Sequence, residues 1–332
     1  MKIIVYFSIL IMTILLTVII TKGLITILKR KKYGQKILED GPKWHKEKEG
    51  TPTMGGISFI VVISLVMFFS LFILKDKSSH KEFVLYLNVM FFAITNGLIG
   101  AIDDLAKIKK LQNKGLSAKT KFLLQSVSVV AFLFCLKKFI GIETIIKIPF
   151  VKEVIDIGPV FYLLSYFLLC GVINSVNLSD GIDGLAICLM LTVGVFISAV
   201  AFFLFESMYM TVFSALVVGG CIGFLILNRH PAKIFMGDTG SLFLGATVVS
   251  ISFLINNLLL VLLFGFVFII EAVSDMLQVI YFKMTKGKRL FLMAPLHHHF
   301  EKKGWSENKI VVVFSAINTI FCFFAFIWLY LG

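Results

Sequence analysis

Long apolar runs alternate with short polar segments along the whole chain. An α-helix needs about 20 apolar residues to cross the hydrocarbon core of a bilayer, and ten runs of about that length occur. Their short polar connections leave no stretch long enough for a separate soluble domain. The pattern predicts an all-α integral membrane protein, a single polytopic domain over residues 1–332. The predicted spans are 3–28, 53–74, 83–102, 122–140, 158–176, 185–204, 208–227, 241–256, 258–282 and 310–331.

Composition supports this fold class. Hydrophobic residues make up 58% of the chain and charged residues 15%, whereas a soluble domain is about a quarter charged. The first run is too long for the core of a signal peptide and lacks a small-residue cleavage site, so we predict a retained span. All five cysteines fall inside predicted spans without metal-ligand spacing, which indicates packing residues.

The basic residues are distributed unequally between the two ends of the predicted spans. Loops that follow odd-numbered spans carry 23 of the 32 Lys and Arg residues, and the opposite loops and chain ends carry 8. Basic residues concentrate on the cytoplasmic side, so we predict cytoplasmic odd-numbered loops and both termini outside. The net charge of +13 is therefore mainly a topology signal that also attracts anionic lipid or substrates, and we predict no nucleic-acid partner.

Acidic residues gather where the predicted spans meet the cytoplasm. Asp103 and Asp104 follow the third span, Asp180 and Asp183 lie in NSVNLSDGIDGLA, and Asp238 lies in NRHPAKIFMGDTGS. Carboxylates at a membrane boundary are costly to desolvate and repel one another, so their convergence requires a cationic partner. Mg²⁺ is the economical one, since it binds one or two carboxylates together with substrate phosphates. The alternative is that these residues are solvated and never meet.

Two Gly-rich segments predict tight turns between helices. The fifth helix is expected to end near Asn177, with a turn through Asp180–Gly181 and a new helix starting near Asp183. Residues 237–241, GDTGS, are expected to open the eighth helix. Free N–H groups at such places suit nucleotide or phosphate groups. GDTGS alone is weak evidence, because many helix starts look alike.

Three consecutive histidines, His297–His299, lie in the last predicted cytoplasmic loop. Imidazoles bind metal, donate to phosphate oxygen, or act as acid or base near pH 7. Consecutive side chains diverge, so at most two are expected in one site, and a solvated loop is the alternative. His45, His80 and His230 have no such context and are predicted to be structural.

Four lysines accompany the acidic segments. Lys48 precedes the Gly-rich GTPTMGG, and Lys107, Lys119 and Lys121 follow the aspartate pair. Each is a surface lysine on the simplest interpretation, but together they would neutralise phosphate beside a metal. This inventory indicates phosphoryl chemistry between one substrate in lipid and one in water. It does not identify the substrates.

The ninth predicted span contains two acidic residues, Glu271 and Asp275, which are four apart and share a helix face. They form inter-helix hydrogen bonds or a bend on one interpretation, and line an entrance for a lipid phosphate on the other. A secondary transporter with ion-coupling acids is the competing class of protein. It predicts mid-span charges and inverted repeats, whereas most of the acids lie at one surface and no repeat is visible.

Four motifs, LIGAIDDLAK, NSVNLSDGIDGLA, NRHPAKIFMGDTGS and PLHHHFEKKGWSE, resemble the signatures of the polyprenyl-phosphate N-acetylhexosamine-1-phosphate transferases. The resemblance extends from about Gly50 to the end of the chain and includes the ten-span layout. TPTMGG, PLHHHFE and GWSE resemble the branch that uses UDP-MurNAc-pentapeptide. Sister transferases that use UDP-N-acetylglucosamine generally lack the intact HHHFE run and are the alternative.

The resemblance implies transfer of phospho-MurNAc-pentapeptide to undecaprenyl phosphate, which gives lipid I and UMP for peptidoglycan synthesis. It implies a Mg²⁺ cofactor, a homodimer surrounded by membrane lipid, and a multi-pass location in the bacterial plasma membrane with a cytoplasmic active site. Direct attack by the lipid phosphate and a two-step path through an aspartyl-phosphate are both chemically feasible. We favour direct attack.

The resemblance also implies catalytic roles for individual residues. Asp103 matches a base or orienting group toward the lipid phosphate, and Asp104 a group that positions metal or substrate. Asp238 matches the Mg²⁺ ligand, and His297 a histidine beside the metal and phosphates. Lys121 best matches the family lysine, with Lys119 as the alternative.

On the nucleotide side, the resemblance places Asp183 toward uracil and Phe235 in a stack on it. The full set of implied substrate-binding residues is Lys48, Thr53, Asn177, Asp180, Asp183, Asn228, Phe235 and His298.

Overall fold

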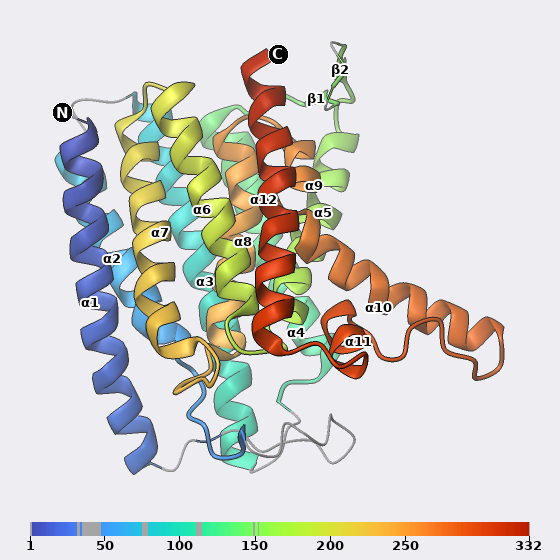
Figure 1. Cartoon of the computed structure of the whole chain (residues 1–332). Helices are drawn as coiled ribbons and strands as arrows, with labels where there is room; N and C mark the ends of the chain where they lie inside the picture. Colours follow the sequence, from blue (N-terminus) through green and yellow to red (C-terminus); the bar gives the residue numbers. More distant parts are fainter. Residues whose placement is uncertain are drawn as a thin grey trace.

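A computed structural model describes residues 2–31, 34, 48–74, 79–110, 115–148, 150–151 and 153–331. The long helices run side by side in one bundle, and both termini lie at the end that carries a small hairpin (Figure 1). The helices are α1 (Lys2–Arg30), α2 (Gly56–Leu74), α3 (His80–Lys110), α4 (Ala118–Cys135), α5 (Val160–Ser179), α6 (Leu185–Phe203), α7 (Met208–Asn228), α8 (Gly237–Leu254), α9 (Val261–Phe264), α10 (Phe266–Met284), α11 (Leu296–Lys302) and α12 (Glu307–Leu331), with short turns of other helix types at Leu136–Ile140 and Leu258–Leu260.

The prediction of an all-α membrane protein with about ten spans is confirmed. Among the described residues, nine helices are long and apolar enough to cross a membrane, and a bent pair counts as a tenth. The ninth span is not the continuous helix 258–282 that hydropathy predicts. It breaks at Gly265, where its two parts meet at 85°.

A side chain of α12 explains how the chain tolerates this break. Asn318 donates from Nδ2 to the Phe264 carbonyl at 3.1 Å and accepts from the Val267 N–H at 3.1 Å. A helix break inside a membrane protein leaves backbone groups that must find partners. Asn318 supplies them for these two groups, which hydropathy does not reveal because the partner is about 50 residues away in sequence.

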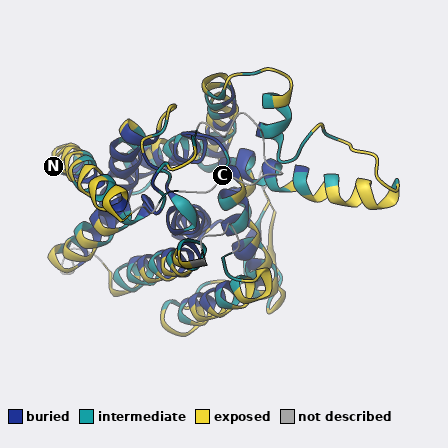
Figure 2. Ribbon diagram, turned by 90° about the horizontal axis from the view of Figure 1, so that it is seen from below, coloured by how far each residue is buried: buried dark blue, intermediate teal, exposed yellow. Residues whose placement is uncertain are grey.

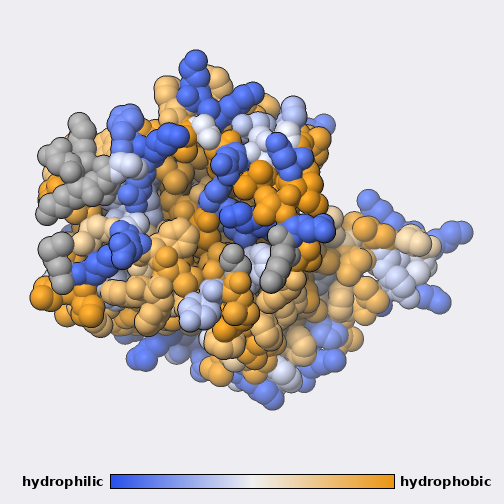
Figure 3. Space-filling model, turned by 90° about the horizontal axis from the view of Figure 1, so that it is seen from above, coloured by the Kyte–Doolittle hydropathy of each residue, from blue (hydrophilic) through white to orange (hydrophobic). Residues whose placement is uncertain are grey.

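Beyond the break, α10 projects sideways from the bundle (Figure 1). Its outer half is exposed, as the view from below shows (Figure 2), and includes apolar Met276, Leu277 and Ile280. Seen from above, the arm is hydrophobic along its length and hydrophilic at its tip, and hydrophilic groups gather on the end of the bundle (Figure 3). Apolar side chains on a membrane-protein surface suit contact with lipid tails.

Helix α8 forms the centre of the bundle and packs against α2, α3 and α5. Small residues allow these helices to approach closely. A Cβ atom added at Gly100 would lie 2.1 Å from the Asp238 carbonyl oxygen, and one added at Gly245 would lie 2.7 Å from the Ile173 Cα. The contact at Gly100 brings the end of α3 against the start of α8, which places the aspartates from both elements together.

Residues 141–157 alternate Ile, Val and Lys, a pattern that predicts a small outer hairpin between the fourth and fifth spans, and the structure contains such a hairpin. Strands β1 (Ile145–Lys147) and β2 (Val154–Asp156) pair antiparallel, and the Thr144 hydroxyl donates to Asp156 Oδ1 at 2.6 Å. The hairpin lies between the end of α4 and the start of α5, whereas the aspartates lie near the end of α3 and at the start of α8.

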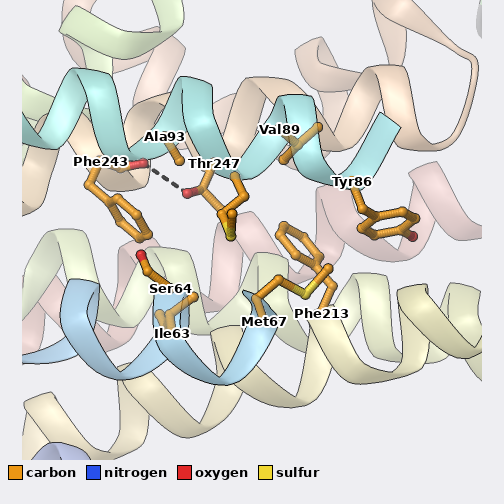
Figure 4. A pocket seen from close by; sticks show the side chains of 10 residues that line it. Ile63, Ser64, Met67, Tyr86, Val89, Ala93, Phe213, Phe243 and Thr247 are labelled. Atoms are coloured by element: carbon orange, nitrogen blue, oxygen red, sulfur yellow. Dashed lines mark hydrogen bonds between the residues drawn. The ribbon is translucent and has the colours of Figure 1, made fainter. Parts of the chain in front are cut away.

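A small pocket lies inside the bundle between α2, α3, α7 and α8 (Figure 4). Its lining is mostly apolar, and the Thr247 hydroxyl there donates to the carbonyl of Phe243 at 2.8 Å rather than to a ligand. None of the predicted site residues lines it. The chemistry therefore has to be sought where the helices end.

Candidate active site

The aspartate pair lies on the last turns of α3, not in a loop after it, because the helix continues to Lys110. Asp104 accepts hydrogen bonds from the N–H groups of Asp238 and Thr239 at 3.1 and 2.9 Å and from the Thr239 hydroxyl at 2.7 Å. The Asp104 carboxylate, on α3, thus caps the start of α8. In this structure Asp104 therefore occupies the Asp238 and Thr239 N–H groups that the sequence offered to a phosphate.

We expect Asp104→Asn to lower the free energy of unfolding by about 1–3 kcal/mol, since the amide leaves at least one buried donor of α8 without an acceptor. Thermal unfolding of the purified protein in detergent measures the change. Glu143→Gln is the matched control, because it makes the same carboxylate-to-amide change at an exposed position. Equal unfolding midpoints for the two variants would contradict the capping role.

Lysines compensate the charge of the carboxylates. Asp238 Oδ2 lies 2.9 Å from Lys107 Nζ and 2.7 Å from Lys121 Nζ, and Lys107 Nζ also lies 2.7 Å from Asp103 Oδ2. Asn177 donates to Asp238 Oδ1 at 3.1 Å. Of the two lysines that the resemblance left open, Lys121 reaches the site, whereas Lys119 is exposed. Buried charges require such partners.

The predicted turn between α5 and α6 is present, with α5 extending to Ser179 and α6 starting at Leu185. Gly184 adopts a left-handed φ of 79° at the start of α6. Burial raises the pKa of the Asp180 carboxyl well above its usual range, and the negative charges of Asp238 and Asp104 act in the same direction. The Asp180 carboxyl is therefore electrostatically coupled to the carboxylates of α3 and α8.

The side chains of the three consecutive histidines diverge to different partners, as predicted. His297 is fully buried, and its Nδ1 lies 2.9 Å from Glu271 Oε2. A Cβ atom at Gly181 would lie 2.3 Å from His297 Nε2, so this nitrogen faces the turn at Asp180. His298 pairs with Glu301 of its own helix at 2.6 Å. The His299 ring accepts from the Leu292 N–H at 3.1 Å.

A second group of charges surrounds Asp183. Its Oδ1 lies 2.7 Å from Lys48 Nζ, and its Oδ2 accepts from the Ala232 N–H at 2.9 Å and lies 3.2 Å from His230 Nδ1. Glu307 accepts from the Asp183 N–H at 2.9 Å and also pairs with Lys48 at 2.7 Å. Asp183 thus forms a group with His230 and Glu307 that is distinct from the group of Asp103, Asp104 and Asp238, which corrects the expectation of a single cluster of five aspartates.

The remaining predicted residues lie around the segment that enters α8. Asn228 donates to the Ile234 carbonyl at 2.9 Å, and Phe235 donates from its N–H to the Pro52 carbonyl at 2.8 Å. A Cβ atom at Gly237 would lie 3.0 Å from the Thr53 hydroxyl. These contacts join the TPTMGG segment to the α7–α8 loop, so both form one wall of the site.

Known proteins match this chain over most of its length. The glycosyl transferase family 4 model matches residues 85–256, and signature 1 of phospho-N-acetylmuramoyl-pentapeptide-transferase matches residues 48–60. The enzyme named phospho-N-acetylmuramoyl-pentapeptide-transferase from Clostridium acetobutylicum is 44% identical over 91% of this chain and 92% of its own length. The enzyme of that name from Caldicellulosiruptor bescii is 41% identical over 95% and 94%.

This chain belongs to the phospho-N-acetylmuramoyl-pentapeptide-transferase family. It is therefore a transferase, and the resemblance drawn from the motifs is confirmed at the level of the branch. The sister branch that uses UDP-N-acetylglucosamine is not favoured, and neither is a transporter.

The donor set of this site fits a hard divalent cation. Carboxylate oxygens of Asp103, Asp104 and Asp238 all lie within 4.8 Å of one another, and Mg²⁺ prefers oxygen ligands. Both carboxylate oxygens of Asp104 already accept hydrogen bonds from the start of α8. Asp103 and Asp238 are the better pair, and a cation between them would replace the Lys107 ammonium as counter-charge.

Sequence interpretation assigned no individual catalytic or binding role to three residues of this site. Lys107 was grouped with Lys48, Lys119 and Lys121 as a lysine that would neutralise phosphate, although its spacing of four from Asp103 also allows an ion pair on one helix face. His230, predicted to be structural, contacts Asp183, and Glu307 links Asp183 to α12. Glu307 ends the GWSE motif, which was the available signal. His80 is exposed at the start of α3, and His45 lies outside the described residues.

Proposed function

We propose that this protein transfers phospho-MurNAc-pentapeptide from UDP-MurNAc-pentapeptide to undecaprenyl phosphate, which produces lipid I and UMP for peptidoglycan synthesis. The choice of this reaction rests on the enzyme name that the relatives share. The geometric support is the convergence of Asp103, Asp104 and Asp238 with two lysines at one end of a membrane-spanning bundle. Such a site serves a lipid phosphate from the bilayer and a nucleotide from water.

We propose that Asp238 and Asp103 hold Mg²⁺. When bound, the ion neutralises charge on the phosphoanhydride that breaks. Lys121 and Lys107 would then be released toward phosphate oxygens, because a cation takes over their pairing with Asp238. Their ammonium groups bind phosphate as point charges.

We propose that an oxygen of undecaprenyl phosphate attacks the sugar-linked phosphorus directly. A phosphate monoester, with a second pKa of about 6, is already largely ionised at pH 7. Asp103 Oδ1 accepts from the Leu116 N–H at 2.7 Å, and Oδ2, which now faces Lys107, is the oxygen that would face the cation. This supports an orienting role for Asp103 rather than that of a nucleophile in a two-step path.

The nucleotide side of the proposal uses the wall formed by TPTMGG and the α7–α8 loop. Phe235 would stack on uracil, and Thr53, Asn228 and Lys48 would line the pocket. Asp183 is held by Lys48, Ala232 and His230, so it would fix the loop that faces uracil. Asn177, Asp180 and His298 would complete the pocket toward the pyrophosphate.

Charge distribution supports a plasma-membrane location with this site on the cytoplasmic side, since the basic loops lie at the same helix ends. The homodimer implied by the resemblance stays a prediction.

Release of UMP by the purified protein in detergent tests the proposal. UDP-MurNAc-pentapeptide with undecaprenyl phosphate should give UMP and lipid I only with added Mg²⁺. UDP-N-acetylglucosamine should give neither. Product from the second nucleotide would indicate the sister transferase, and ion-dependent uptake into vesicles without UMP release would indicate a transporter.

We expect Phe235→Ala to raise the KM for the sugar nucleotide by roughly tenfold, because base–aromatic stacking contributes about 1–3 kcal/mol. The KM for the lipid phosphate should change little. Initial rates at varied concentrations of each substrate give both values. Phe167→Ala, an exposed residue of α5, is the control, and an unchanged nucleotide KM in Phe235→Ala would reject stacking.

A further inference from the structure

Glu271 of α10 is a buried carboxylate that the proposed reaction leaves without a role. Its side chain is 0% exposed, as is that of His297. The His297 backbone N–H donates to Glu271 Oε1 at 3.2 Å, and His297 Nδ1 lies 2.9 Å from Oε2. One carboxylate thus contacts both the backbone and the ring of the same histidine.

We propose that Glu271 is a positioning residue that keeps a proton on Nδ1 of His297 and leaves Nε2 facing the active site as a proton acceptor. An ionised carboxylate only accepts hydrogen bonds. Nδ1 must therefore carry the hydrogen of this contact, and the neutral ring has its lone pair on Nε2. The same arrangement stabilises the imidazolium once Nε2 has taken up a proton, as an aspartate does in hydrolase triads.

The surroundings of Nε2 support a ligand on that side. Nε2 is buried and has no hydrogen-bond partner among the described residues. It lies beside the turn at Gly181, where an added Cβ atom would be 2.3 Å from it. Gly181 follows Asp180, on whose pKa the charges of Asp238 and Asp104 act. A buried polar atom without a partner is rare in folded proteins, so this one is suited to a substrate group.

The substrate class that this atom suits is a phosphate monoester that binds as its monoanion, because the carboxylates around the site disfavour the dianion that predominates in water at pH 7. The proton passes from the phosphate oxygen to Nε2, and no covalent bond to the protein forms. The phosphate then carries the second negative charge that makes it a better nucleophile, and the proton leaves on the phosphate of the departing nucleotide. This step rests on the proposed function.

A purely structural role for Glu271 would be to fasten α11 to α10. Glu271→Gln separates the two roles. The glutamine oxygen still accepts from the His297 backbone N–H, which turns the amide NH₂ group toward Nδ1. Nδ1 must then accept, and the ring proton moves to Nε2. Both contacts survive, but the tautomer is inverted.

We expect Glu271→Gln to lower kcat by about 100-fold or more, the usual contribution of a positioned acid–base group, with a nearly unchanged KM for the nucleotide. Glu143→Gln is the control and should behave as wild type. In parallel, ¹⁵N-histidine NMR of the detergent-solubilised protein reports the tautomer, and His297→Gln identifies the His297 signals by their loss. Wild type should be protonated on Nδ1, and Glu271→Gln on Nε2.

Two results would overturn the inference. One is a near-normal kcat in Glu271→Gln, which is what simple fastening of α11 predicts. The other is a wild-type His297 signal that shows a neutral ring protonated on Nε2. Failure of the proposed function has a different signature, because wild type itself would then release no UMP while the NMR measurement still reports the tautomer.

Discussion

Asp238→Asn should reduce Mg²⁺-dependent UMP release by about 10³-fold, which is the upper range for loss of one electrostatic contact to a reacting group. Asp238 contributes the carboxylate that two lysines share and that, with Asp103, would hold the cation. An amide at this position is a weaker ligand and carries no charge. Lys107 and Lys121 would then bind phosphate without the group that positions them.

The fold should survive this substitution. The asparagine oxygen can still accept from Asn177 Nδ2, and Lys107 keeps its pair with Asp103. Comparison of kcat and the thermal midpoint with those of Asp156→Asn, a carboxylate of the outer hairpin, separates chemistry from stability. Near-normal Mg²⁺-dependent rates in Asp238→Asn would remove this residue from the proposed cation site.

Gly181→Ala should lower kcat by about 100-fold, although it adds a single methyl group. That Cβ would lie 2.3 Å from His297 Nε2, which is too close for a carbon and a nitrogen that are not bonded to each other. Because His297 is fixed by Glu271 on its other side, the ring cannot retreat without breaking that contact. Misplacement of a reacting group by about 1 Å is enough for a loss of this size.

The control for this prediction is Gly171→Ala on α5, where an added Cβ meets nothing within 4 Å. Rates and unfolding midpoints of both variants should be measured together. A folded Gly181→Ala protein with wild-type kcat would show that His297 Nε2 does not need its present position.

Particular residues show which structural features can be predicted from local sequence. The runs of apolar residues predicted the spans, because burial of backbone groups in lipid permits little besides helices. The Gly-rich segments predicted the turns at Asp180 and before α8. The same reasoning offered the N–H groups of GDTGS to a phosphate, and it did not pair Lys107 with Asp238. Neither contact could be predicted, because Asp104 for the N–H groups and Asp238 for Lys107 each lie on another helix.

The sequence by itself determined the helical membrane fold, the end of the bundle where the acids gather, and the family. These follow from periodicity, hydropathy and motif spacing, which are local properties of the chain. Only the tertiary structure decided which charges pair. It divided the aspartates between the Asp103–Asp104–Asp238 group and the Asp183–Glu307 network, and it joined Glu271 to His297. Such contacts depend on how closely helices approach, and that is fixed by small residues such as Gly100 packing against distant backbone.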